Sequence, residues 1–73
     1  MLTFKFLYEK DGEYFYEYYT EGHLDAPGIV SIKSKGEGRI VSLSKEDPFK
    51  NYAFHAIHGI EVPEEKTGTV AWY

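Results

Sequence analysis

The sequence has no cysteine, so neither a disulfide bridge nor a thiolate metal site can stabilise its 73 residues. It also has no apolar run long enough to span a bilayer, and no amino-terminal signal in which basic residues precede an apolar stretch. We therefore expect one small cytoplasmic domain covering residues 1–73, without membrane contact, whose stability depends on a hydrophobic core.

Positive charge is also scarce. The chain has 8 Lys and Arg residues against 12 Asp and Glu residues, a formal net charge of −4. A negative chain is poorly matched to a phosphate backbone. The basic residues are concentrated within residues 29–50, whereas residues 1–28 are acidic. We therefore do not expect nucleic acid to be the main partner.

Aromatic residues, in contrast, are abundant: seven tyrosines, five phenylalanines and one tryptophan. A core of this size cannot bury all of these rings, so some are expected on the surface. Exposed rings are typical of surfaces that bind partners, so the composition predicts a contact surface.

The pattern of residues 47–59 predicts a helix, the only one expected in the chain. Asp47 is a favourable N-cap, and Pro48 suits the first helical position because the N–H that proline lacks has no helical partner there. Gly59 can adopt the left-handed conformation that commonly ends a helix. Apolar residues recur with helical spacing and form a stripe that must pack on an apolar surface. These residues are Phe49, Tyr52, Ala53, Ala56, Ile57 and Ile60.

A β-hairpin is predicted around Asp11 and Gly12, because apolar residues alternate in residues 2–9 and aromatic residues crowd residues 14–20. One face of this hairpin is wholly aromatic, and we expect it to meet the helix. Its members are Phe4, Phe6, Tyr8, Tyr14, Tyr16 and Tyr18.

The register of this hairpin follows from the cost of burying a charge. A two-residue turn would place the carboxylate of Glu17 opposite Phe6, on the aromatic face. A three-residue loop, Lys10–Gly12, with Gly12 left-handed as a bulge, moves Glu17 opposite Lys5 instead. We therefore predict the three-residue loop. The cross-strand pairs that follow are Lys5 with Glu17, Leu7 with Phe15, and Tyr8 with Tyr14.

A second hairpin is predicted from residues 29–34 and 39–44, with a turn at residues 35–38. Its expected apolar pairs are Val30 with Leu43 and Ile32 with Val41. Residues 69–73 predict the last strand, on which Val70 and Trp72 share the face that meets the helix. The element order β-β-β-β-α-β predicts an α+β fold, an antiparallel sheet of four or five strands with one helix packed across one face.

Three histidines are the only candidates for a metal site: His23, His55 and His58. The spacing of His55 and His58 lacks a further ligand one turn away, and surface histidines near a helix carboxyl end are a simpler interpretation. No serine lies in a glycine-flanked elbow. We therefore predict no catalytic residue, no cofactor, no resident metal and no small-molecule ligand.

The favoured function is a non-catalytic module that binds another protein or a second copy of itself. Phe54 lies off the apolar stripe and is the most telling candidate for a contact. The predicted partner surface comprises Phe54, His55, His58, Phe15 and Tyr19. One alternative is a single-stranded nucleic-acid binder that uses the tyrosine-rich sheet and the basic hairpin. The other is a small metal-dependent or hydrolytic enzyme that uses His23, His55 and His58.

Overall fold

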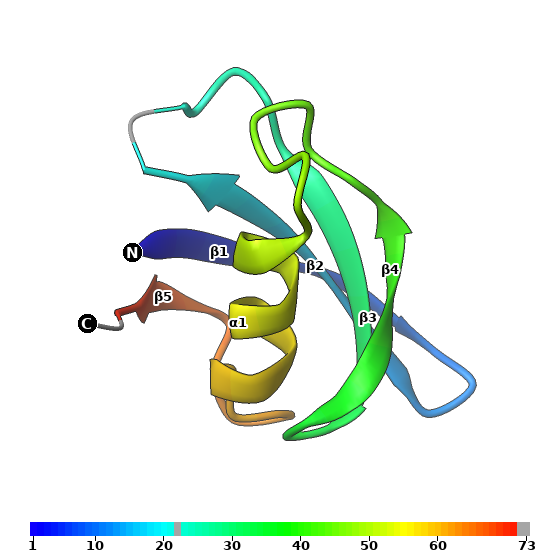
Figure 1. Cartoon of the computed structure of the whole chain (residues 1–73). Coiled ribbons are helices and arrows are strands. Elements are labelled where there is room, and N and C mark those ends of the chain that lie inside the picture. The colour runs from blue at the N-terminus through cyan, green and yellow to red at the C-terminus, as the bar shows by residue number, and fades with distance from the viewer. Residues whose placement is uncertain (22, 72–73) are drawn as a thin grey trace.

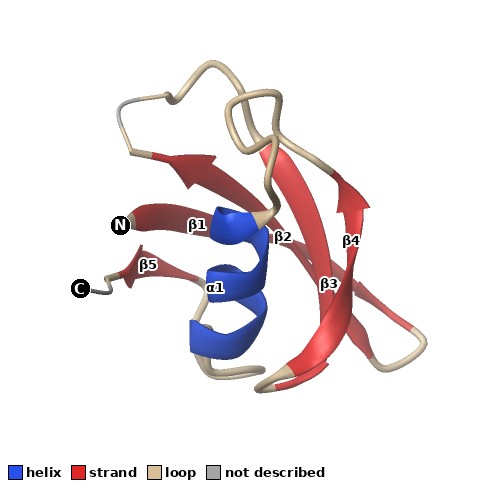
Figure 2. Ribbon diagram, viewed as in Figure 1, coloured by secondary structure: helices blue, strands red, loops and turns tan. Residues whose placement is uncertain are grey.

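The computed structural model describes residues 1–21 and 23–71, and it shows five antiparallel strands with one helix against one face of the sheet (Figures 1 and 2). The strands lie in the order β4-β3-β2-β1-β5, so β2 is central. The predicted α+β class, an antiparallel sheet with one helix packed across one face, is confirmed. The elements are β1 (Leu2–Lys10), β2 (Glu13–Thr20), β3 (Gly28–Ser34), β4 (Glu37–Ser42), α1 (Asn51–Gly59) and β5 (Thr67–Val70).

The first hairpin has the predicted pairing of Lys5 with Glu17. Its turn differs from the prediction. Asp11 and Gly12 both adopt left-handed conformations, with φ of 53° and 80°, and form a two-residue turn instead of a three-residue loop. Asp-Gly favours this turn because its backbone twist matches that of the strands. The predicted positive φ at Gly12 is confirmed.

A bulge in β1 reconciles the two-residue turn with the observed register. The pairing shifts between Phe6 and Tyr8, which leaves Leu7 as the extra residue. Tyr8 therefore lies opposite Phe15, so the predicted pairs Leu7–Phe15 and Tyr8–Tyr14 are wrong. The consequence is that Tyr8 moves from the predicted aromatic face to the opposite face of the sheet.

The remaining aromatic face of the hairpin packs against α1, as predicted. Tyr16 and Tyr18 are fully buried, and Phe4 packs edge-on against Tyr16 with ring centroids 5.7 Å apart. Burying each large side chain contributes roughly 1.5–3 kcal/mol to stability. The core consists of Leu2, Phe4, Tyr16, Tyr18, Val30, Ile32, Ala53, Ala56, Ile57 and Ile60.

The helix begins at Asn51 rather than directly after Asp47. Lys50 adopts a left-handed conformation with φ of 63°, which interrupts the path from the preceding turn. Pro48 is therefore not the first helical residue. Phe49 is 89% exposed, so its predicted place in the apolar stripe is also wrong.

Asp47 nevertheless caps the helix across this turn. Its carboxylate oxygens accept the backbone N–H groups of Tyr52 and Ala53 at 3.0 and 2.9 Å. Its carbonyl accepts the Lys50 N–H at 3.1 Å, which closes the turn. The predicted cap residue is therefore correct in role, although the helix it serves starts four residues later.

Gly59 ends the helix as predicted, but without a left-handed conformation; among the described glycines only Gly12 and Gly36 have positive φ. The reason for glycine here is space. A Cβ atom at this position would lie 2.6 Å from Cγ1 of Val70 on β5. Gly59 thus lets the end of α1 approach the edge strand.

The second hairpin closes earlier than predicted. Gly36 is left-handed, with φ of 87°, and β4 begins directly after it at Glu37. The observed pairs are Val30 with Ile40 and Ile32 with Gly38, so the predicted pairs are wrong. Val41 and Leu43, which the sequence predicts to share one apolar face with Val30 and Ile32, are exposed, whereas Val30 and Ile32 are buried.

The last strand, β5, pairs with β1, and its Val70 packs against the core as expected. Trp72 and the end of the predicted strand lie outside the described residues. No helix in the described part of the chain has the length and apolar character needed to cross a membrane.

Candidate functional site

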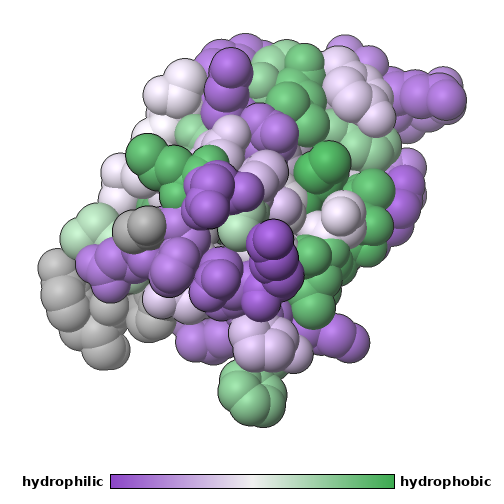
Figure 3. All heavy atoms as spheres, turned by 90° about the horizontal axis from the view of Figure 1, so that it is seen from above, coloured by the Kyte–Doolittle hydropathy of each residue, from purple (hydrophilic) through white to green (hydrophobic). Residues whose placement is uncertain are grey.

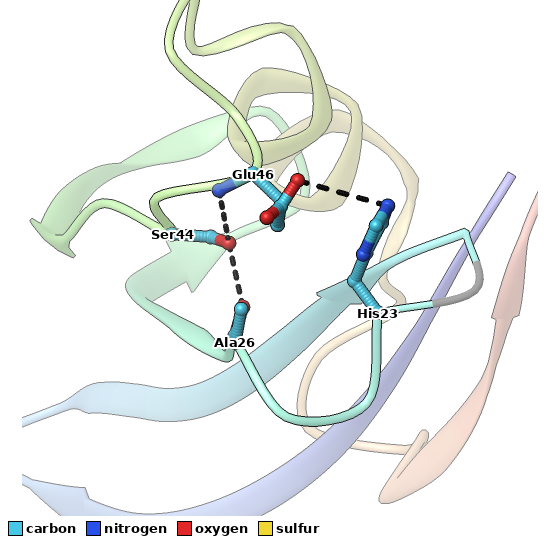
Figure 4. Close-up of polar contacts among 4 residues, drawn as sticks. All are labelled: His23, Ala26, Ser44 and Glu46. Atoms are coloured by element: carbon cyan, nitrogen blue, oxygen red, sulfur yellow. Dashed lines mark hydrogen bonds and ion pairs between the residues drawn. The ribbon is translucent and has the colours of Figure 1, made fainter.

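The three histidines do not converge. His23 is in the loop after β2, where its Nε2 lies 3.7 Å from Oε2 of Glu46 (Figure 4). His58 is beside the β3–β4 turn, since a Cβ at Gly36 would be 3.5 Å from its Nδ1. Within residues 1–21 and 23–71, no three His, Cys, Asp or Glu side chains are grouped closely enough to hold a metal ion.

A buried polar network surrounds Ser44 (Figure 4). Its Oγ donates to the carbonyl of Ala26 at 2.5 Å and accepts the Glu46 N–H at 3.1 Å. The Ser44 N–H donates to the hydroxyl of Tyr18, which in turn donates to Asp47. These groups hold the loop after β2 and the start of α1 against the sheet.

The same network superficially resembles a hydrolytic site, because a serine, a carboxylate and a histidine are near one another. Ser44 and Asp47 are almost completely buried, however, and Tyr18 is fully buried. Burial raises the pKa of the Tyr18 hydroxyl to about 12. A substrate cannot reach these groups in the folded chain, so the network is structural.

The stronger candidate is the face of β1–β4 that points away from α1, here called the open face (Figure 2). Because successive side chains on a strand point to opposite sides, the neighbours of buried Tyr16 and Tyr18 project there. The side chains of the open face include Lys5, Tyr8, Glu13, Phe15, Glu17, Tyr19, Ile29, Ser31, Lys33 and Arg39.

Two aromatic rings and a guanidinium group are stacked on the open face. Tyr8 and Phe15 lie parallel, with ring centroids 4.5 Å apart and planes at 12°. The guanidinium carbon of Arg39 lies 5.9 Å from the centroid of Phe15. Phe15 is only 8% exposed because of these neighbours, whereas Tyr8 is 51% exposed. Stacked rings and a cation near a ring face are both favourable arrangements.

Glu13 connects this stack to the next strands. Its Oε1 accepts hydrogen bonds from Oγ of Ser31 at 2.5 Å and from Nε of Arg39 at 3.2 Å. The Ser31 hydrogen bond is the main reason that the pKa of Glu13 is lowered, followed by the charges of Arg39 and Lys33. We call Tyr8, Glu13, Phe15, Ser31 and Arg39 the aromatic–arginine cluster.

A hollow of about 270 Å³ adjoins the cluster, lined by Glu13, Lys33, Glu37, Gly38 and Arg39. Its walls carry both signs of charge. Because hydrogen bonding keeps Glu13 ionised, this carboxylate is poorly suited to act as a general acid near neutral pH. The arrangement is better suited to holding a charged group of a partner.

The five residues predicted for the partner surface are divided between two sides of the molecule. Phe15 and Tyr19 are on the open face, where the Tyr19 hydroxyl donates to Glu17 at 2.8 Å. Phe54, His55 and His58 are on α1, which covers the other face, and Phe54 is 49% exposed. The structure therefore divides the five into a pair on the open face and a group of three on α1.

Sequence reasoning missed four members of the cluster: Tyr8, Glu13, Ser31 and Arg39. Tyr8 was assigned to the wrong face because simple alternation does not register the bulge at Leu7. Arg39 reaches Phe15 across two strand pairings, Phe15 with Ser31 and Ser31 with Arg39. The Asp-Gly turn was the one local signal that favoured a two-residue turn and hence a compensating bulge.

The two edges of the sheet are less suited to association than the open face. β4 has a pairing irregularity at Val41, and β5 is only four residues long. Bulged and short edge strands discourage pairing with another strand. A partner that added a strand would therefore meet an unfavourable edge on either side.

A further apolar area lies on the side of the molecule where β4 runs (Figure 3). Val41 and Leu43 are exposed large apolar residues of this region. They offer contact area without a polar group that would orient a partner, unlike the aromatic–arginine cluster. We therefore take the open face as the candidate functional site.

Comparisons of this chain with protein-family models, with curated proteins and with solved structures found no match. The function is therefore interpreted from the geometry of the chain itself. The features that the interpretation rests on are the aromatic–arginine cluster and the neighbouring hollow.

Proposed function

We propose that this protein is a small, non-catalytic, cytoplasmic module that binds another protein through the open face of its sheet. The single observation that carries the proposal is the aromatic–arginine cluster. It presents Tyr8 and Arg39 on the side of the sheet away from α1. Tyrosine and arginine are enriched at the residues that dominate binding energy in protein interfaces.

The cluster is also held in place before any partner arrives. Arg39 is fixed by its hydrogen bond to Glu13 and by Phe15, and Tyr8 is fixed by stacking. Ordering a long side chain on binding costs about 0.5–1.5 kcal/mol, so a preordered cluster reduces this cost. The cytoplasmic location belongs to the same proposal and is favoured by the lack of cysteine.

The two alternatives have less support. A nucleic-acid binder would stack bases on the tyrosine-rich strand, but Tyr16 and Tyr18 are fully buried in the core. A metal-dependent enzyme would need its histidines together, and His23 is held beside Glu46 in a loop. Protein binding is the function that uses the groups exposed on the open face.

Site-specific photo-crosslinking tests the proposal. A p-benzoylphenylalanine residue replaces Tyr8 in one variant and Phe54 in a second, matched variant, because the two native side chains are 51% and 49% exposed on different faces. The proposal predicts a discrete protein adduct from position 8 and much less from position 54. The adduct from position 8 should disappear when Arg39→Ala is added to the same chain.

The partner in each adduct is identified by mass spectrometry of the crosslinked peptides. Equal adduct from both positions would contradict an assignment to the open face. No adduct from position 8, or one that Arg39→Ala leaves unchanged, would overturn the proposed function.

A further inference from the structure

We infer that the partner of the open face is a second copy of this chain, related by a two-fold axis that runs parallel to the strands between β2 and β3. The inference rests on the proposed function and names its partner. It follows from the order in which charges and rings occur across the sheet.

Opposite charges lie on neighbouring strands in the middle of the open face. The central strand β2 contributes Glu13 and Glu17, and its two neighbours contribute Lys5 from β1 and Lys33 from β3. Arg39 follows on β4. A face of one sign would repel its own copy, whereas the opposite signs of β2 and β3 can be matched by a copy that is displaced by one strand.

Symmetry selects that displacement. In a two-fold dimer the same surface meets itself. Each strand on one side of the axis therefore faces, in the copy, the strand that lies at the same distance on the other side of the axis. An axis along β2 would place Glu13 against Glu13. An axis between β2 and β3 exchanges these strands, so that Lys33 faces Glu13 of the partner subunit and Glu13 faces Lys33 of the partner subunit.

The aromatic–arginine cluster fits the same axis. Tyr8, Phe15, Ser31 and Arg39 form one row across β1, β2, β3 and β4. Exchange of β1 with β4 reverses this row in the copy. Arg39 therefore meets Tyr8 of the partner subunit at both ends of the row, a cation next to an exposed ring.

The size of the face indicates a weak dimer. The two longer dimensions of the molecule are 30 and 23 Å, so no face exceeds about 700 Å², which is less than the ~800 Å² per partner of a standard interface. β3 and β4 curve toward α1 (Figure 1), so the two faces are closest at the central strands, and the long side chains of Tyr8 and Arg39 must span a wider gap at the edges. Association should therefore depend on concentration, with the dimer dominant only at high concentration.

Reciprocal charge reversal tests the inference by sedimentation equilibrium at protein concentrations up to about 1 mM. In a dimer of Lys33→Glu chains, carboxylates face each other at positions 13 and 33. In a dimer of Glu13→Lys chains, ammonium groups face each other. Each variant alone should dimerise at least about tenfold more weakly than the wild type.

An equimolar mixture of the two variants should associate again, because each like-charge contact becomes an attraction between different chains. This recovery cannot come from changes within one chain. The matched control is Lys50→Glu, a reversal at an exposed site beside α1, which should leave the dimer unchanged. Near-UV circular dichroism checks that each variant is folded, since Glu13→Lys also loses the contacts with Ser31 and Arg39.

Salt provides a second measurement, which compares the wild type with Lys33→Glu, the variant that leaves the contacts of Glu13 with Ser31 and Arg39 in place. Added salt should weaken the wild-type dimer and strengthen association of Lys33→Glu, because screening reduces attraction in the first and repulsion in the second. A wild type that stays monomeric at all concentrations, or variants that fail to recover on mixing, would overturn the second-copy inference. A different protein crosslinked at position 8 would overturn it while leaving the proposed function intact.

Discussion

Tyr18 combines a buried ring with a hydroxyl that needs hydrogen-bond partners, and that hydroxyl connects β2 to the segment before α1. The hydroxyl accepts the Ser44 N–H at 3.1 Å and donates to Oδ2 of Asp47 at 3.3 Å. Asp47 in turn caps α1, so one hydroxyl connects the centre of the sheet to the start of the helix.

Tyr18→Phe should therefore destabilise the protein by about 1–3 kcal/mol, since it leaves a buried N–H without its acceptor. Urea denaturation measures this loss. Tyr19→Phe is the matched control, because it removes a hydroxyl of the same type from the half-exposed open face and should cost much less. Equal losses for the two variants would show that the Tyr18 hydroxyl does not connect the layers.

The same residue predicts the alkaline limit of stability. Burial raises the pKa of Tyr18 to about 12 in the folded chain, whereas an unfolded tyrosine titrates near its ordinary value of 10. The stabilisation is complete below pH 10 and is lost as the pH rises from 10 through 12, because only the unfolded chain releases the proton in this interval. Tyr18→Phe should show a smaller loss of stability over this interval than the wild type.

At the level of elements, the contact between the end of α1 and β5 depends on the absence of a side chain. Gly59 lies so close to Val70 that a Cβ would come within 2.6 Å of Cγ1. Alanine normally stabilises a helix relative to glycine by about 0.5–1 kcal/mol. Crowding against β5 should reverse that effect here.

Gly59→Ala is accordingly predicted to lower the free energy of unfolding by about 1–3 kcal/mol, in the range of overpacked cores. The control is the double variant Gly59→Ala with Val70→Ala, in which truncation of Val70 makes room for the new methyl group. In a double-mutant cycle the second change should recover part of the loss. A Gly59→Ala variant more stable than the wild type would contradict the prediction, because it would show that β5 can move away from the new methyl group without loss of stability.

At the level of the whole molecule, 73 residues provide only one small core. The carboxyl-terminal strand β5 should therefore contribute substantially to stability by covering one edge of that core. β5 pairs with β1 through Val70 and Leu2, and Leu2 is buried in the core. The sequence predicts that Trp72, which lies outside the described residues, extends this contact with the core.

Deletion of residues 71–73 tests that prediction. Docking of Trp72 predicts a loss of several kcal/mol in urea denaturation, as for truncation of other buried tryptophans. Deletion of Tyr73 alone is the control and should be much milder. An intact thermal transition with altered self-association would instead make the carboxyl end part of a contact surface.

Much of the architecture could be predicted from local pattern. The alternation of rings with polar residues identified the face that meets α1, and the cost of burying Glu17 against a ring identified its pairing with Lys5. The helical spacing from Tyr52 to Ile60 identified the buried side of α1. Each of these depends on a repeat of two or 3.6 residues, which the amino-acid order carries directly.

The candidate site could not be read in the same way, because a single inserted residue reverses which face the next side chain occupies. The bulge at Leu7 places Tyr8 on Phe15, although a three-residue loop would give the same pairing of Lys5 with Glu17. A two-residue turn with a bulge and a three-residue loop thus give the same register, and the conformation of the turn decides which face Tyr8 occupies. Arg39 joins the cluster only through pairing of β2, β3 and β4, a long-range arrangement that no short stretch of sequence encodes.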